Sequence, residues 1–425
     1  MKIKKAYKKS GAAQKVLEKV SSLRVLQGEN SLRFPKGFEE YEVWLDALET
    51  MVEERQLSPN RKREIIDEAC RQVQDLSLDG FLADVCRIKN IYLSRRMSPY
   101  RVVYPILGPA NVFPRRKKVG EETISFNLRR STRATSRIIR EREELGATSV
   151  HFETFGADLE VATICSVAVK ARNVDEAEFV ADKRIRFYLG LLSFVTLYRQ
   201  GRPMLPIVPF DTPLCSHALA PFITVHEPDG RLADGGTYWY TEIKPLQKYR
   251  GFTQDVIPKI RKNERRIQEW LRKSPMRVLL ERCLSDYHEA LSEPSYVNAF
   301  LKLWILLERL MNVERGDAEI AIKRLGSLYP DNSDAVLLTR HLLHRRNAVV
   351  HDSPVRRNES YRTIDLVRTH IETVFVNIAS NQEGFTSLNE FWEMADNMRA
   401  GAQACKKRLR ILKNAVVRLD KLATP

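Results

Sequence analysis

The sequence has few cysteines for its length, and they are scattered. The 425 residues include six: Cys70, Cys86, Cys165, Cys215, Cys283 and Cys405. No two of them form a CxxC pair, which argues against both a zinc module and a disulfide framework. We therefore expect a protein of the reducing cytoplasm.

Long apolar runs are also missing. The longest apolar-leaning stretch, Phe187 to Tyr198, is well short of the roughly 20 residues that cross a bilayer. The lysine-rich start is not followed by an apolar region with a small-residue cleavage site, so we expect no secretory signal and no membrane partner. P-loop, GxGxxG and GxSxG signatures are absent as well.

Basic residues are in excess, and the excess is concentrated at the two ends. The chain has 70 Lys+Arg and 54 Asp+Glu, a net charge of +16. Residues 1–20 contain seven Lys and one Glu, and residues 401–425 contain seven basic residues and Asp420. Such ends fit attraction to phosphate backbones, and solvated, solubilising tails are the alternative. A third cluster, RRKK at 115–118, is expected to lie on a loop.

Hydrophobic periodicity divides the chain into three parts. Residues 1–96 show helical spacing, residues 97–250 mix strand-like segments with one long helix, and residues 251–425 are helical again. We expect a multidomain protein with a helical N-terminal region, an α+β middle domain and a C-terminal all-α bundle.

Within the middle domain, strands are expected at 101–107, 121–127, 149–155 and 159–170, a helix at 174–199, and a hairpin of 222–227 with 238–244. In the C-terminal part, helices are expected near 254–273, 276–292, 295–313, 317–328, 333–350, 359–380 and 385–422. Short loops between such helices indicate antiparallel neighbours in a bundle. The last helix carries the basic C-terminal cluster.

One segment, LLTRHLLHRRNAVVHDSP at 337–354, contains Arg346, Asn347 and, five residues after Arg346, His351. It resembles the HEPN superfamily, helical-bundle domains whose nuclease members carry Arg, a polar residue, and His four to six residues after the Arg. The upstream segment YVNAFLKLWILLERL, with Trp304 and Glu308, resembles the long core helix of the Apea-like HEPN branch. The resemblance covers roughly residues 275–380.

This resemblance implies a metal-independent endoribonuclease without a cofactor, in antiphage defence or a toxin-like role. His351 would act as general base or acid, Arg346 as phosphate clamp and Asn347 as positioning donor, while Glu308 would orient Arg346. A neutral histidine with a pKa of about 6.5 and a permanently charged arginine suit these roles. One protomer has too few groups for both acid and base, so the resemblance implies a homodimer.

RNA is the expected partner, and the expected RNA-binding residues are Arg345, Lys406, Lys407 and Arg408. No metal site is expected, because His341 and His344 have no carboxylate or cysteine at ligand spacing.

Three other interpretations stay open. Arg345 and Arg346 could simply stabilise a helix C-terminus, with His351 bonded to a free carbonyl. The HEPN-like domain could be a non-catalytic interaction module. The third is a Mg²⁺-dependent nuclease, because Asp229 followed by Glu242 and Lys244 resembles the PD-(D/E)xK pattern.

Overall fold

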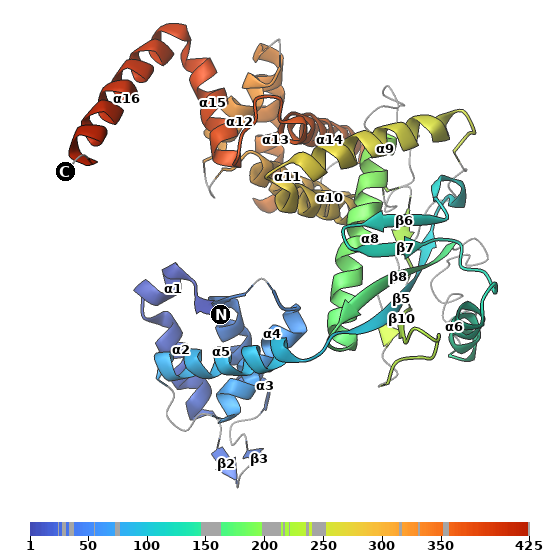
Figure 1. The fold of residues 1–425 in the computed structure, drawn as a ribbon. Coiled ribbons are helices and arrows are strands. Elements are labelled where there is room, and N and C mark those ends of the chain that lie inside the picture. The colour runs from blue at the N-terminus through green and yellow to red at the C-terminus, as the bar shows by residue number, and fades with distance from the viewer. Residues whose placement is uncertain are drawn as a thin grey trace.

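The computed structural model shows a helix-rich chain with a small antiparallel sheet between its two helical parts (Figure 1). It describes residues 1–23, 25–27, 31–33, 38–54, 56–72, 77–145, 163–197, 214–215, 217–220, 222–234, 238–239, 252–313, 317–329, 332–351 and 357–423. None of the helices in these ranges is both long enough and apolar enough to cross a membrane.

The N-terminal part is helical, as predicted. Its helices are α1 (Lys5–Lys9), α2 (Ala12–Ser22), α3 (Phe38–Met51), α4 (Pro59–Gln72) and α5 (Leu78–Ser94). Ser58 caps α4, since its Oγ accepts a hydrogen bond from the Arg61 amide at 3.2 Å. Two short antiparallel pairs were not predicted: β1 (Lys2–Ile3) with β4 (Val52–Glu53), and β2 (Val25–Gln27) with β3 (Ser31–Arg33). These helices bury an apolar cluster of their own.

The sheet follows, in the strand order β11-β10-β5-β8-β7-β6, with β9 paired to the end of β5. Its strands are β5 (Ser98–Leu107), β6 (Arg116–Val119), β7 (Glu122–Ser125), β8 (Thr163–Ala171), β9 (Ala218–Leu219), β10 (Ile223–His226) and β11 (Tyr238–Trp239). A 3₁₀ turn, η1 (Ala110–Val112), and helix α6 (Arg133–Glu144) lie between strands. The strands predicted at 101–107, 121–127 and 159–170 are confirmed where they are described, and 149–155 lies outside the described residues.

The predicted hairpin of 222–227 with 238–244 is confirmed for its described residues. Strand β10 pairs with β11 in antiparallel register, with Ile223 opposite Trp239. The turn after β10 contains Gly230 at φ +90°, a conformation that favours glycine.

The expectation that RRKK at 115–118 lies on a loop is wrong. Residues 116–119 form the edge strand β6, with Lys118 opposite Thr123 of β7. Charged side chains are common on edge strands, where they face water and discourage pairing with other chains. Lys117 forms an ion pair with Glu264 of α9 (Val256–Lys273).

Helix α8 (Val174–Leu197) lies between the sheet and the C-terminal helices (Figure 1). Residues 187–196, most of the longest apolar run in the sequence, are all buried. Gly190 allows α8 to approach α10 (Arg277–Leu291) closely, since a Cβ at this position would lie 2.0 Å from the Leu284 carbonyl oxygen. The close packing joins the sheet and the bundle in one apolar cluster.

The remaining helices are α11 (Tyr296–Leu310), α12 (Ala318–Ser327), α13 (Asn332–His351), α14 (Arg357–Ser380), α15 (Leu388–Ala400) and α16 (Ala402–Ala423). The single helix predicted at 385–422 is therefore two. Gly401 adopts φ +85° between them, which ends α15 and redirects the chain. Helix α16 extends away from the bundle (Figure 1).

The division into domains at residues 96 and 250 stays a prediction. The first boundary lies between α5 and β5, and the second falls in residues 240–251, which are outside the described ranges.

Candidate functional site on helix α13

Helix α13 carries the Arg-Asn-His motif, and its backbone is helical through His351. His351 was expected just past the helix end, and it is instead the last helical residue. At about 100° per residue, Arg346 and His351 therefore point about 140° apart around one helix, while Asn347 and His351 are one turn apart on the same face. The His351 side chain lies outside the described residues.

The described part of the motif is accessible to solvent. Arg346 is half-buried, and its Nη1 donates a hydrogen bond to Oδ1 of the exposed Asn347 at 3.1 Å. His341 and His344 are also exposed. His344 and His351 are seven residues apart, so helix geometry places both on one face. Within the described ranges, no group of three or more His, Cys, Asp or Glu could hold a metal ion.

Glu308 has a different partner from the one expected. Its Oε1 accepts a hydrogen bond of 2.7 Å from Nε1 of Trp304, one turn earlier on α11. No hydrogen bond or ion pair among the described side chains joins Glu308 to Arg346, so its orienting role stays a prediction. The surface pairing with Arg309 or Lys302 is not seen either: Arg309 pairs with Asp286, and Lys302 pairs with Glu289 and Glu293.

Trp304 is a core residue, as expected from its helical spacing. Its side chain is 1% exposed within the shared apolar cluster. Helix α11 packs against α10 and α14, and α13 contacts α12 and α11. The motif helix is therefore attached to a well-packed helical frame.

A buried polar network that sequence reasoning missed lies in this frame. Tyr287 of α10 donates a hydrogen bond to Glu372 of α14, and Arg368 donates to Glu372 at 2.8 Å and to Asp365 at 2.6 Å. Burial raises the pKa of Glu372, and the neighbouring Arg368 opposes this shift. The sequence signal was the i, i+4 spacing of Arg368 and Glu372 on one helix.

The residues expected to bind RNA fall in two places. Arg345 is half-buried on α13, whereas Lys406, Lys407 and Arg408 are exposed on α16. Arg408 donates a hydrogen bond to Asn397 of α15. Helix α16 also exposes apolar side chains, at Leu409, Ile411, Leu412 and Val416.

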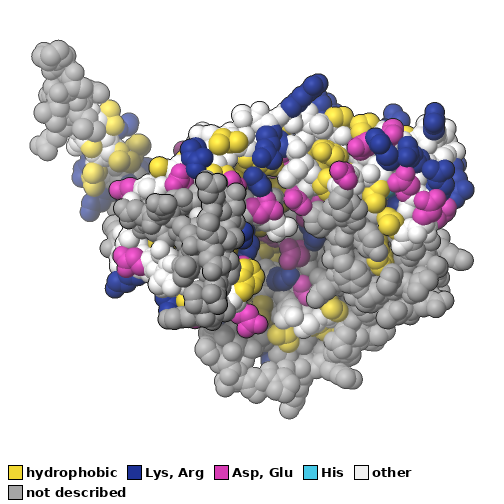
Figure 2. Space-filling model, turned by 90° about the horizontal axis from the view of Figure 1, so that it is seen from below, with side chains coloured by type: hydrophobic (Ala, Val, Ile, Leu, Met, Phe, Trp, Pro, Cys, Tyr) yellow, Lys and Arg dark blue, Asp and Glu magenta, His cyan; other side chains and the backbone are white. Residues whose placement is uncertain are grey.

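Basic charge forms no single patch on the face drawn in Figure 2. Lys and Arg side chains lie there in several separate groups, interleaved with Asp and Glu. On this face, the groups offer separate contact points for phosphate rather than one continuous basic track.

The residues of the Mg²⁺ nuclease pattern are only partly described. Asp229 lies exposed in the turn after β10, where it pairs with Arg137 of α6 at 3.3 Å. The Arg231 backbone amide also donates to Asp229, and these contacts, led by that hydrogen bond, lower the pKa of its carboxyl group. Glu242 and Lys244 lie outside the described residues.

Comparison of the chain with protein-family models, with curated proteins and with solved structures gave no match.

Proposed function

We propose that this protein is a metal-independent endoribonuclease of HEPN type that acts in the cytoplasm. The observation that carries the proposal is the accessible Arg346–Asn347 pair on a helix that continues through His351. In this proposal residues 275–380 form the HEPN-like core, and the rest of the chain senses a trigger or restrains the nuclease.

The chemistry assigns one role to each residue of the motif. His351 removes the proton from a ribose 2′-hydroxyl, and the resulting oxyanion attacks the adjacent phosphorus atom. Arg346 binds the non-bridging phosphate oxygens, whose negative charge grows in the transition state. Asn347 holds the Arg346 guanidinium through the 3.1 Å hydrogen bond, and it positions the sugar-phosphate backbone.

A homodimer would supply the acid and the base from two copies of His351. Leu337 and Leu338 support this assembly, because these large apolar residues are 63% and 43% exposed on the motif helix. Burying them against a second copy is favourable, and two-fold closure is the commonest symmetry. The RNA would then meet Arg345 near the two-fold axis, and Lys406, Lys407 and Arg408 on α16.

The test is a growth assay with induced wild-type protein, His351→Ala and Glu242→Ala, with and without phage challenge. We expect toxicity or protection in the wild type and in Glu242→Ala, and its loss in His351→Ala. His341→Ala is the matched control, since it removes an exposed histidine from the same helix. Loss only in Glu242→Ala would favour the Mg²⁺ nuclease, and full activity in folded His351→Ala would favour a non-catalytic module.

A further inference from the structure

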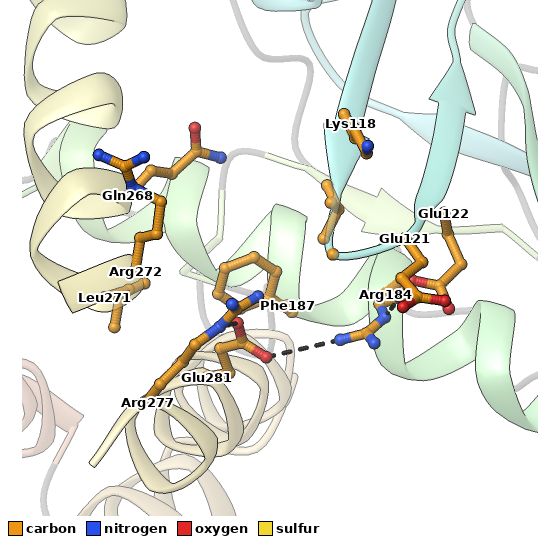
Figure 3. A pocket seen from close by; sticks show the side chains of 12 residues that line it. Lys118, Glu121, Glu122, Arg184, Phe187, Gln268, Leu271, Arg272, Arg277 and Glu281 are labelled. Carbon is orange, nitrogen blue, oxygen red and sulfur yellow. Dashed lines mark hydrogen bonds and ion pairs between the residues drawn. The ribbon is translucent and has the colours of Figure 1, made fainter. Parts of the chain in front are cut away.

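A cavity of about 600 Å³ opens between the β6–β7 hairpin and the helices α8, α9 and α10 (Figure 3). Lys118 and Glu121 come from the hairpin, Arg184 and Phe187 from α8, and Gln268 and Arg272 from α9, with Arg277 and Glu281 of α10 below them. The volume lies within the range typical of small-molecule sites in proteins. This cavity is distant in sequence from the motif on α13.

The floor of the cavity is fixed by ion pairs. Arg184 pairs with Glu122 at 2.7 Å and with Glu281 at 3.5 Å, and Arg277 pairs with Glu281 at 2.6 Å. Figure 3 shows Arg184 directed from α8 toward Glu281. These carboxylates are thus already compensated, and the network joins α8, α10 and the hairpin into one support.

The hairpin turn is held against the same support. Gly120 adopts φ +65°, and a Cβ there would lie 3.1 Å from Nη2 of Arg184. Glycine therefore allows the Arg184 guanidinium to lie directly against the turn that carries Glu121. Both the turn and the arginine are positioned before any ligand enters.

Two cations on the cavity rim have no protein partner. Lys118 on β6 and Arg272 on α9 are exposed, and no hydrogen bond or ion pair in the described part of the chain involves either one. Figure 3 places Lys118 across the cavity from Gln268 and Arg272. A cation on each side of one cavity suits an anionic group bound between them.

Other lining groups suit the rest of an organic ligand. Phe187 presents an apolar ring surface and is 5% exposed. The amide of Gln268 and the carboxylate of Glu121 can exchange hydrogen bonds with a heterocycle and with hydroxyl groups. An aromatic face, an amide, a carboxylate and two unpaired cations together match a nucleotide more closely than a simple anion.

We propose that this cavity binds a nucleotide. Lys118 and Arg272 contact its phosphates, Phe187 packs against the base, Gln268 hydrogen-bonds the base edge and Glu121 accepts from the ribose hydroxyls. Because the ligand bridges the hairpin and the bundle, its binding draws β6 and α9 together. The inference stands independently of the nuclease proposal.

The test is isothermal titration of the full-length protein with ATP in EDTA at low salt, with AMP and tripolyphosphate as comparison ligands. Lys118→Gln and Arg272→Gln should each weaken ATP binding about tenfold, because each removes one charge-assisted contact. Arg265→Gln is the matched control, since it removes an exposed cation from the same helix outside the cavity. Phe187→Leu should weaken ATP more than tripolyphosphate.

The proposal is supported if ATP binds in the micromolar range and the two rim variants, with unchanged melting temperatures, lose affinity while Arg265→Gln does not. It is overturned if ATP and AMP fail to bind at millimolar concentration. It is also overturned if tripolyphosphate binds as tightly as ATP, or if the rim variants bind as well as the control. RNA cleavage is not part of this readout, so its outcome leaves the nuclease proposal untouched.

Discussion

The hydroxyl group of Tyr287 on α10 donates a hydrogen bond of 2.6 Å to Oε1 of Glu372 on α14, and both side chains are buried. The same carboxylate oxygen accepts from Arg368, which is also buried. This single carboxylate therefore satisfies two donors from two helices. The relationship holds together the frame to which the motif helix is attached.

Glu372→Ala should lower the free energy of unfolding by about 3–5 kcal/mol, because it leaves the Arg368 guanidinium buried beside one remaining carboxylate. Urea denaturation followed by circular dichroism measures this change. Asp365→Ala is the control: its side chain is 39% exposed, so the loss should be less than about 1 kcal/mol. Equal losses in the two variants would contradict the buried network.

Gly190→Ala should destabilise the protein, although alanine is intrinsically the better helix former by about 1 kcal/mol. The added Cβ would lie 2.0 Å from the Leu284 carbonyl oxygen, so α8 and α10 must separate. We expect a loss of at least about 2 kcal/mol. Thermal melting decides the sign, and a raised melting temperature would show that the two helices are not in close contact.

The stability of the protein should depend on the protonation of Glu178. Burial, and then the nearby Asp182, raises the pKa of Glu178 to about 7, with Arg186 opposing and Asp175 adding to the shift. The folded state therefore binds the proton more tightly than the unfolded state. The stability from this group is complete below the unfolded pKa of 4.5 and is lost as the pH rises through 7.

Glu178→Gln should remove this loss, because the amide stays neutral. Its melting temperature should match the wild type near pH 4.5 and exceed it at pH 8, by up to about 3 kcal/mol of unfolding free energy. Melting curves across this range test the expectation. Glu144→Gln, at an exposed position, should show no such pH-dependent difference.

Purified protein should cleave single-stranded RNA in EDTA and leave a 2′,3′-cyclic phosphate and a 5′-hydroxyl, since the nucleophile belongs to the RNA. Arg346→Lys should recover little activity, because lysine lacks the planar fork that holds two phosphate oxygens. Arg340→Lys, at an exposed position of the same helix, is the control. DNA should remain intact. Metal-dependent cutting or 5′-phosphate products would refute the proposed chemistry.

A chain that ends at Gly401 should bind RNA more weakly and with a flatter salt dependence. Each cation of α16 that leaves a phosphate lowers the slope of log K against log salt by about 0.7. Leu409→Gln with Leu412→Gln is the matched control, because it keeps every charge of the helix. An unchanged slope after truncation would show that the basic C-terminal segment is only a solvated tail.

Local signals predicted the elements that depend on local chemistry. The start of α4 follows from Ser58 and Pro59, and the β10–β11 hairpin from the turn at Gly230. Strand β6 was missed because its four charged or polar positions become a strand only through pairing with β7. The break at Gly401 was missed because one glycine in a helical pattern is compatible with either a helix or its end.

The candidate site shows the same limit. The motif residues Arg346 and His351 are visible in the sequence because they share one helix. The Trp304–Glu308 hydrogen bond depends on side-chain rotamers, which the spacing of two residues does not determine. The cavity beside Phe187 is built from four separate segments, so no stretch of sequence contains its pattern.

The two apolar clusters divide the chain into two units that can melt separately. The N-terminal helices bury one cluster, and the sheet with the bundle buries the other. Polar contacts join the units, including the hydrogen bond from the Tyr92 hydroxyl to Asn173 Oδ1 at 3.2 Å. Such contacts contribute little cooperativity, so heating should produce two calorimetric transitions. Glu372, Gly190 and Glu178 all belong to the second unit, and the transition of the first should stay fixed when they are changed.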